Sequence, residues 1–163
     1  MTLKLQMDGR KAENYSNNAQ RIRVITEDWV DSNMFCPYCG NKYISHFENN
    51  RPVADFFCPS CMEEYELKSK GGSISNKIND GAYNTMIERI TSINNPNFFF
   101  MQYSKMNLQV ENFVMVPKYF FSPDIIEKRT PLANTAKRAG WIGCNILLNR
   151  ICLLYTSPSP RDA

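Results

Sequence analysis

The feature that most constrains this sequence is a pair of CxxC motifs, Cys36-Pro-Tyr-Cys39 and Cys58-Pro-Ser-Cys61, with 18 residues between them. This spacing lies in the range typical of a four-cysteine zinc site, in which each motif supplies two thiolates to one edge of a tetrahedron. Gly40 directly follows the first motif and permits a tight turn that points backbone N–H groups at sulfur. Because protein fills all four positions, we expect a structural zinc ion. A pair of redox dithiols or a chance spacing is the alternative.

The composition fits a globular chain in a reducing compartment. The 163 residues are 43% hydrophobic and 21% charged, which is ordinary for about one folded domain and unlike a disordered or collagen-like chain. No run approaches the ~18 apolar residues of a membrane span, and the first residues lack the apolar segment of a secretory signal. We therefore expect a cytoplasmic protein with no membrane partner. Reducing conditions favour metal binding by CxxC pairs over structural disulfides.

Hydrophobic periodicity predicts an α+β (mixed α/β) fold, in which a mixed sheet is flanked by helices. The predicted order is helix, hairpin, helix, hairpin and a short helix, over 17–33, 52–57 with 65–69, 74–92, 98–103 with 108–116, and 125–129. The second CxxC motif lies at the tip of the first hairpin. A zinc ion would therefore fix this hairpin against the chain that leaves the first helix. Arg150 is expected in a strand, and Cys144 is expected to be a buried apolar residue.

Asp55, Glu66 and Lys68 flank the second CxxC motif. Residues two apart in a strand share a face, so Glu66 and Lys68 project together while Leu67 points into the core. Asp55 belongs to the partner strand and can approach them diagonally. Two carboxylates can bind Mg2+ through oxygen, and an adjacent ammonium can stabilise charge that develops on a phosphodiester. A surface network of ion pairs is the alternative.

Several blocks of the sequence resemble the DpnI-type restriction endonucleases, which cleave DNA at GATC when its adenine is N6-methylated. The resemblance covers roughly residues 20–146 and is carried by both CxxC motifs and by the blocks ITEDWV, HFENNRPVADF, YELKSK, INDGAY, NNPNFFF and RAGWIGCNI. The Asp and Glu-x-Lys pattern, on a hairpin that follows a helix, also resembles the PD-(D/E)xK nuclease core.

The resemblance implies a type II, Mg2+-dependent endonuclease with a zinc-binding insertion. It implies that Asp55, Glu66 and Lys68 are catalytic and that Asp55 and Glu66 hold the Mg2+. The zinc ligands that it implies are Cys36, Cys39, Cys58 and Cys61. The implied partner is double-stranded DNA with an N6-methylated GATC site, and we expect the protein to act as a monomer.

The resemblance also divides the chain. Residues 17–150 would form the catalytic domain, with CxxC motifs at 36–39 and 58–61, after an N-terminal extension over 1–16. Members of the family resemble one another in a C-terminal winged-helix domain, to which nothing in this sequence corresponds. Residues 151–163 show no periodic face and resemble a non-native tail. A natural disordered tail is the alternative.

Four other polar residues lie near these motifs. His46 is the only histidine, and we expect it at the surface or behind the ligands, because an HNH-type nuclease site needs a further ligand set. Glu27 is either a third metal carboxylate or, as the favoured interpretation, part of a solvated helix face. Asp80 and Tyr83 are expected to pack a helix or position phosphates.

Basic residues gather towards the end of the chain. Between Lys118 and Arg150, six basic and two acidic residues give a local net charge of +4, against +3 for the whole sequence. The predicted DNA-binding residues are Trp141, Lys137, Arg138 and Ser73. We expect Trp141 to contact the adenine methyl group, and a core tryptophan is the alternative. Burying one methyl is worth about 0.8 kcal/mol, so a strict methyl requirement needs more than one such contact.

Two other functions fit the same residues. One is a non-catalytic zinc-ribbon module that binds nucleic acid, in which Asp55, Glu66 and Lys68 form only an ion network. The other is an inactive, truncated fragment of the nuclease. The positions of the Asp55 and Glu66 carboxylates bear on the first alternative, because oxygens that lie far apart cannot share one metal ion.

Overall fold

The computed structural model describes residues 4–48 and 54–155, with side chains up to Ile151, and the chain divides into two compact units. The first unit comprises Met1–Ser73 and Pro96–Val116, and the second comprises Ile74–Asn95 and Pro117–Ala163. Both units contain sheet and helix, so the predicted mixed α/β class is confirmed. Over the described residues, none of the helices combines the length and hydrophobicity that a bilayer crossing requires.

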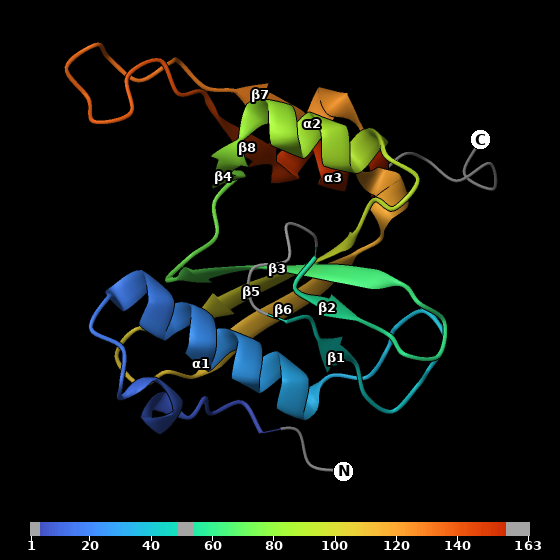
Figure 1. The fold of residues 1–163 in the computed structure, drawn as a ribbon. Helices are drawn as coiled ribbons and strands as arrows, with labels where there is room; N and C mark the ends of the chain where they lie inside the picture. Colours follow the sequence, from blue (N-terminus) through green and yellow to red (C-terminus); the bar gives the residue numbers. More distant parts are fainter. Residues whose placement is uncertain (1–3, 49–53, 156–163) are drawn as a thin grey trace. The chain divides into compact units, whose positions relative to one another are not determined.

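The first unit is built on a five-stranded sheet in the order β1-β2-β3-β5-β6 (Figure 1). The strands are β1 Ser45–His46, β2 Phe56–Phe57, β3 Glu64–Gly71, β5 Asn97–Tyr103 and β6 Val110–Val116. Neighbours are antiparallel except β3 and β5, which are parallel. Both predicted hairpins are therefore present. The first strand of the first hairpin is shorter than predicted, because β2 begins at Phe56 and Asp55 lies just before it, while Pro52 and Val53 lie outside the described residues. Parallel neighbours need a long crossover, and here the crossover, Ile74–Asn95, belongs to the second unit.

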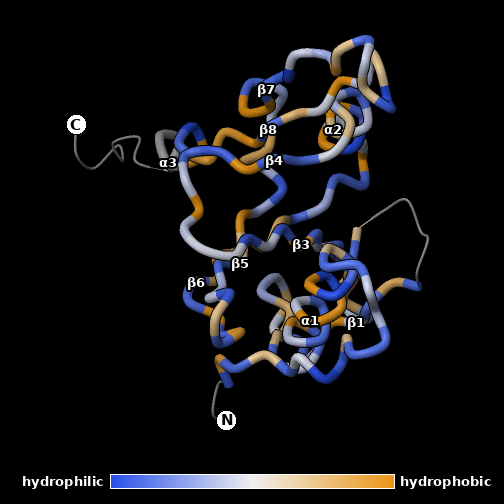
Figure 2. Tube along the Cα trace, turned by 90° about the vertical axis from the view of Figure 1, so that its left-hand side faces the viewer, coloured by the Kyte–Doolittle hydropathy of each residue, from blue (hydrophilic) through white to orange (hydrophobic). Residues whose placement is uncertain are grey.

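Helix α1, Asn18–Asn33, covers one face of this sheet (Figure 1). The helix begins after Asn17, whose side chain accepts hydrogen bonds from the backbone N–H groups of Ala19 and Gln20 and so satisfies two donors of the first turn. Hydrophobic and hydrophilic residues are interleaved along α1 (Figure 2), and Ile25, Trp29 and Val30 are buried. The predicted helix over 17–33 is confirmed.

Aromatic rings form the centre of the core between α1 and the sheet. Phe99 of β5 stacks on Tyr65 of β3 at a centroid distance of 4.8 Å and packs against Phe113 of β6 at 5.0 Å. Trp29 of α1 lies 5.4 Å from the same Phe113 ring. Such aromatic pairs add to the stabilisation from burial. The core therefore joins the helix to three strands of the sheet.

The segment before α1 also belongs to this core. The 3-10 helix η1 spans Gly9–Ala12, and the buried residues Met7 and Ala12 join the same hydrophobic cluster. The indole N–H of Trp29 donates to the carbonyl of Lys4 over 2.7 Å. The N-terminal segment is thereby fixed against α1.

The second unit contains a three-stranded antiparallel sheet in the order β4-β8-β7. Its elements are β4 Lys77–Ala82, α2 Tyr83–Thr91, the 3-10 helices η2 Lys118–Phe120 and η3 Pro123–Ile125, β7 Ile126–Lys128, β8 Gly143–Leu147 and α3 Leu148–Tyr155. Ile146 of β8 pairs with Ile78 on one side and Ile126 on the other, and all three are buried. The orange segment between β7 and β8 extends away from this sheet as a long loop (Figure 1).

The predicted helix over 74–92 is wrong in its first half. Residues Lys77–Ala82 form strand β4, and only Tyr83–Thr91 is helical. The apolar residues repeat every four positions, and a spacing of four returns to the same face of a strand as well as of a helix. Asp80 and Gly81 favour non-helical backbone, and pairing with β8 decides the outcome.

Two further predictions near the end of the chain are wrong. The short helix expected over 125–129 is replaced by strand β7, because Ile126 is buried by pairing with Ile146 of β8. Arg150 was expected in a strand and lies in α3, which follows β8 directly. Cys144 is buried in β8 as predicted. Residues 156–163 of the proposed tail lie outside the described residues.

Candidate active site and metal centre

The four cysteines of the CxxC motifs converge on one point in the first unit. Their sulfur atoms all lie within 4.8 Å of one another. The Cys36 and Cys61 sulfurs are 3.7 Å apart, and those of Cys39 and Cys58 are 3.6 Å apart. Zn–S bonds of about 2.3 Å in a tetrahedron place neighbouring sulfurs about 3.8 Å apart. The donor set therefore fits a tetrahedral zinc ion.

The two motifs make equivalent turns. Gly40 donates its N–H to the carbonyl of Cys36 over 2.8 Å, and Met62 donates to that of Cys58 over 2.9 Å. Both donors adopt left-handed backbone, with φ of 78° and 65°. This conformation costs glycine nothing and is uncommon for methionine. The predicted tight turn at Gly40 is thus confirmed, and Met62 takes the same turn in the second motif without a glycine.

Backbone donors surround one of the buried thiols. Burial opposes ionisation of Cys58, but the N–H groups of Cys61 and Ser60 point at its sulfur and lower its pKa to about 7. Zinc binds thiolate rather than thiol. The turn therefore prepares a ligand for metal binding.

Asp55, Glu66 and Lys68 also lie together: Glu66 and Lys68 belong to strand β3, and Asp55 directly precedes β2. The backbone N–H of Asp55 donates to the Tyr65 carbonyl over 3.0 Å, and an Asp55 carboxylate oxygen accepts the N–H of Leu67 over 2.8 Å. These two hydrogen bonds bracket Glu66. The Lys68 ammonium lies 2.6 Å from a carboxylate oxygen of Glu66, which is only 7% exposed.

The electrostatic state of Asp55 reflects this crowding. Burial raises its pKa, and the negative charges of Glu66 and Glu27 act in the same direction. The hydrogen bond from Leu67 and the positive charge of Lys68 oppose the rise. A carboxylate that is costly to ionise alone is stabilised when a cation arrives. Oxygen ligands of this kind are the ones that Mg2+ prefers.

Glu27 does not lie on a solvated helix face, so the favoured interpretation was wrong. One of its oxygens lies 2.7 Å from Arg23 Nε and the other 2.7 Å from His46 Nε2, and its side chain is only 12% exposed. Arg23 in turn reaches Asp55 at 3.7 Å. Among the described residues, Glu27, Asp55 and Glu66 do not form a group whose ligand oxygens all lie within 4.8 Å. His46 contacts Glu27 from strand β1.

The predicted DNA-binding residues fall in different parts of the fold. Lys137, Arg138 and Trp141 share the loop between β7 and β8 in the second unit, where the two basic residues are exposed. The Arg138 guanidinium lies over the Trp141 ring, 4.5 Å from its centroid. Trp141 is half-buried. Its burial therefore does not decide between a contact to the adenine methyl group and a core tryptophan. Ser73 is exposed at the end of the first segment of the first unit.

Asp80 and Tyr83 of the second unit have local roles. An Asp80 carboxylate oxygen accepts the N–H of Gly81 over 2.8 Å in strand β4. The Tyr83 ring lies under the ammonium of Lys128, 5.4 Å from it. The Tyr83–Lys128 contact connects the start of α2 with strand β7.

The chain matches the model of the DpnI family, described as the Dam-replacing family, over residues 3–154. The chain belongs to this family. The match includes both metal-ligand motifs, the Asp55 and Glu66 region, and the β7–β8 loop. It also reaches four residues into the segment that the sequence had suggested to be a tail.

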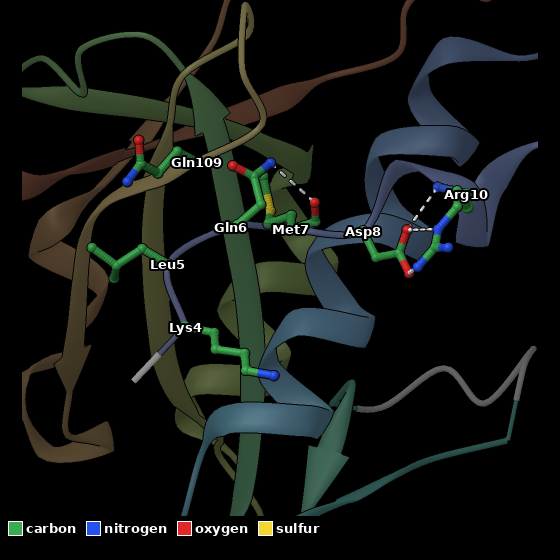
Figure 3. Close-up of a pocket in the computed structure, with 7 residues that line it drawn as sticks. All are labelled: Lys4, Leu5, Gln6, Met7, Asp8, Arg10 and Gln109. Atoms are coloured by element: carbon green, nitrogen blue, oxygen red, sulfur yellow. Dashed lines mark hydrogen bonds and ion pairs between the residues drawn. The ribbon is translucent and has the colours of Figure 1, made fainter. Parts of the chain in front are cut away.

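A separate pocket lies in the N-terminal part of this DpnI-family chain. It has a volume of about 630 Å³ and is lined by Lys4, Leu5, Gln6, Met7, Asp8, Arg10 and Gln109 (Figure 3). Asp8 and Arg10 bind each other along its wall. None of the residues predicted to be functional lines it. The pocket therefore carries no part of the candidate site.

Two residues next to the site, Arg23 and Tyr65, were not predicted from the sequence. Arg23 lies four residues before Glu27, a spacing that places both on one side of a helix. This spacing could have predicted the ion pair between them. Tyr65 precedes Glu66 and points to the opposite face of β3, where its hydroxyl lies 3.1 Å from the Cys36 sulfur. No local sequence pattern predicts this contact, because Tyr65 and Cys36 lie far apart in the sequence.

The cysteine centre predicts a specific loss of zinc. The unmutated protein is expected to hold about one zinc ion per chain. Cys58→Ala removes one of the four ligands, so the purified variant is expected to lose most of this zinc. Metal analysis after dialysis against a weak chelator measures this. Cys144→Ala removes an equally buried thiol outside the cluster and is expected to keep its zinc. Equal zinc contents in the two variants would contradict the assignment.

The raised pKa of Asp55 predicts how stability depends on pH. A carboxyl whose pKa is higher in the folded state stabilises the fold fully below its unfolded pKa of about 3.9, and this contribution is lost as pH rises through the folded pKa. Asp55→Asn cannot ionise and retains an oxygen for the Leu67 N–H. Without Mg2+, the variant's melting temperature is expected to exceed that of the unmutated protein by a margin that grows towards neutral pH.

Thermal unfolding in Mg2+-free buffers from acid to neutral pH measures this margin. Added Mg2+ is then expected to narrow it, because only the unmutated chain has the Asp55 carboxylate. A margin that does not change with pH would show that Asp55 ionises as freely in the folded chain as in the unfolded one.

Proposed function

We propose that this chain is a Mg2+-dependent endonuclease of the PD-(D/E)xK type, which cleaves double-stranded DNA at GATC sites that carry N6-methyladenine. Membership of the DpnI family supports a methyl-dependent restriction endonuclease. The proposed catalytic residues are Asp55, Glu66 and Lys68, with Asp55 and Glu66 as the Mg2+ ligands. We further propose that the protein is a cytoplasmic monomer and that zinc is a structural ion in it.

The observation that carries this proposal is the arrangement of Asp55 around Glu66. Asp55 binds the backbone on both sides of Glu66, at the Tyr65 carbonyl and the Leu67 N–H. This holds the two carboxylate-bearing residues next to each other at the end of the β2–β3 pairing. Lys68 occupies the same face of β3 as Glu66 and contacts its carboxylate. The arrangement supports a nuclease site more than a scattered surface network of charges.

Each side chain has a distinct proposed part in hydrolysis. Bound Mg2+ would supply Lewis-acid polarisation of the scissile phosphodiester. Asp55 and Glu66 provide the oxygen ligands, and burial of Glu66 limits competition from water. The Lys68 ammonium, held beside Glu66, is positioned to stabilise negative charge that develops in the transition state. Arg23 at 3.7 Å from Asp55 supplies a second positive group at the rim of the site.

DNA recognition is proposed to use the β7–β8 loop. Lys137 and Arg138 are exposed cations suited to phosphate contacts, which position DNA without reading its sequence. Trp141 presents an aromatic surface beside Arg138 and is proposed to contact the adenine methyl group. Ser73 is proposed as a further phosphate contact.

A non-catalytic zinc-ribbon module remains the second candidate function, because the cysteine cluster and the basic loop would serve binding without cleavage.

Cleavage of fully methylated plasmid DNA in the presence of Mg2+ tests the proposed activity. Lys68→Ala is expected to slow cleavage about 10²-fold or more, because it removes a charge from the transition state. Lys70→Ala removes an identical side chain two residues further along the same strand and is expected to cleave within a few-fold of the unmutated chain. Equal cleavage by all three proteins would point to another active site or a contaminating nuclease, and binding without cleavage would favour the zinc-ribbon module.

The proposed methyl contact predicts a change in preference rather than in overall binding. One buried methyl is worth about 0.8 kcal/mol, or about fourfold in affinity. Trp141→Ala is therefore expected to lower the ratio of affinities for methylated and unmethylated GATC duplexes by about fourfold. Lys137→Ala should weaken binding to both duplexes alike and reduce the salt dependence of that binding. Titration by fluorescence anisotropy measures both, and an unchanged ratio in Trp141→Ala would refute its role.

A further inference from the structure

Tyr65 connects the cysteine cluster to the sheet. Its side chain is 0% exposed, and its hydroxyl lies 3.1 Å from the Cys36 sulfur. Its ring stacks on Phe99, with an interplanar angle of 5°. The residue is thus held by the core at its ring and by the first motif at its oxygen.

The hydrogen bond has one possible direction when zinc is bound. A metal-bound thiolate carries no proton, so the Tyr65 hydroxyl donates and the Cys36 sulfur accepts. Cys36 is 0% exposed, so water cannot readily replace this donor. Hydrogen bonds from outside the ligand set orient metal ligands, and losing one typically weakens metal binding by about 10–100-fold.

The backbone of Tyr65 serves the other site. Its carbonyl accepts the N–H of Asp55 over 3.0 Å, and Glu66 is the next residue in the chain. The side chain and the backbone of one residue therefore contact the cysteine cluster and the candidate carboxylate site. A displacement of Tyr65 would move both.

We propose that Tyr65 is a positioning residue, whose hydroxyl holds Cys36 in the zinc site and whose backbone links zinc occupancy to the placement of Asp55 and Glu66. The link to the carboxylates rests on the proposed function, because it treats them as a divalent-cation site. The role at Cys36 rests only on the cysteine centre.

Tyr65→Phe tests the role at Cys36, because it removes the hydroxyl and keeps the ring that stacks on Phe99. Zinc is expected to pass to a chromogenic chelator at about 10–100-fold lower chelator concentration than from the unmutated chain. In the Co2+-substituted protein, the thiolate-to-cobalt charge-transfer band is expected to move to lower energy. Tyr103→Phe removes another buried hydroxyl of the same core cluster and should change neither measurement. Zinc retention and a cobalt spectrum unchanged in Tyr65→Phe would overturn the role.

Binding of Mn2+, followed by electron paramagnetic resonance, tests the link to the carboxylates. Mn2+ affinity of the unmutated chain is expected to fall as zinc is withdrawn, while circular dichroism reports the fold. Unchanged Mn2+ affinity in the zinc-free chain would overturn the link. Absence of Mn2+ binding by the zinc-loaded chain would instead overturn the proposed divalent-cation site, and the chelator and cobalt measurements would still decide the role of Tyr65 at Cys36.

Discussion

Four sulfur atoms within 4.8 Å of one another set the condition on which the first unit depends. Thiolates at this separation repel strongly in a partly buried site, and only a cation makes it favourable to ionise all of them. The cluster joins the chain after α1 to both sides of the turn between β2 and β3. Asp55 lies three residues before one ligand and Glu66 five residues after another. The candidate active site therefore lies on the same strand pair, β2 and β3, whose connecting turn carries two of the metal ligands.

The candidate active site concentrates charges that are costly without a bound cation. Asp55 and Glu66 are each near a positive side chain, Arg23 and Lys68 respectively. Glu27 adds negative charge nearby and is itself held between Arg23 and His46. Groups arranged in this way lower the stability of the empty fold and favour ligands of positive charge. Such an arrangement is more typical of a functional site than of a surface that evolved only for solubility.

The sequence predicted features whose geometry is local. The CxxC spacing predicted the cysteine cluster, and Asn17 followed by an apolar stripe predicted α1. The helix over 74–92 failed because a repeat of four residues fits a strand as well as a helix. Strand β7 could not be predicted from Ile126 alone, since its burial depends on Ile146, 20 residues later. For the same reason, the contact between Tyr65 and Cys36 and the approach of Arg23 to Asp55 emerged only from the structure.

The parallel pairing of β3 with β5 has a consequence for the order of folding. It joins Tyr65 to Asn97 and Gly71 to Tyr103, a constant separation of 32 residues. During synthesis, all four cysteines and the whole of β3 leave the ribosome before any residue of β5. One edge of β3 then stays unpaired while the crossover is made, and unpaired edges are prone to associate with other chains. Early binding of a metal ion by the four cysteines would hold β2 against β3. Only one edge of β3 would then stay open, the edge that later pairs with β5.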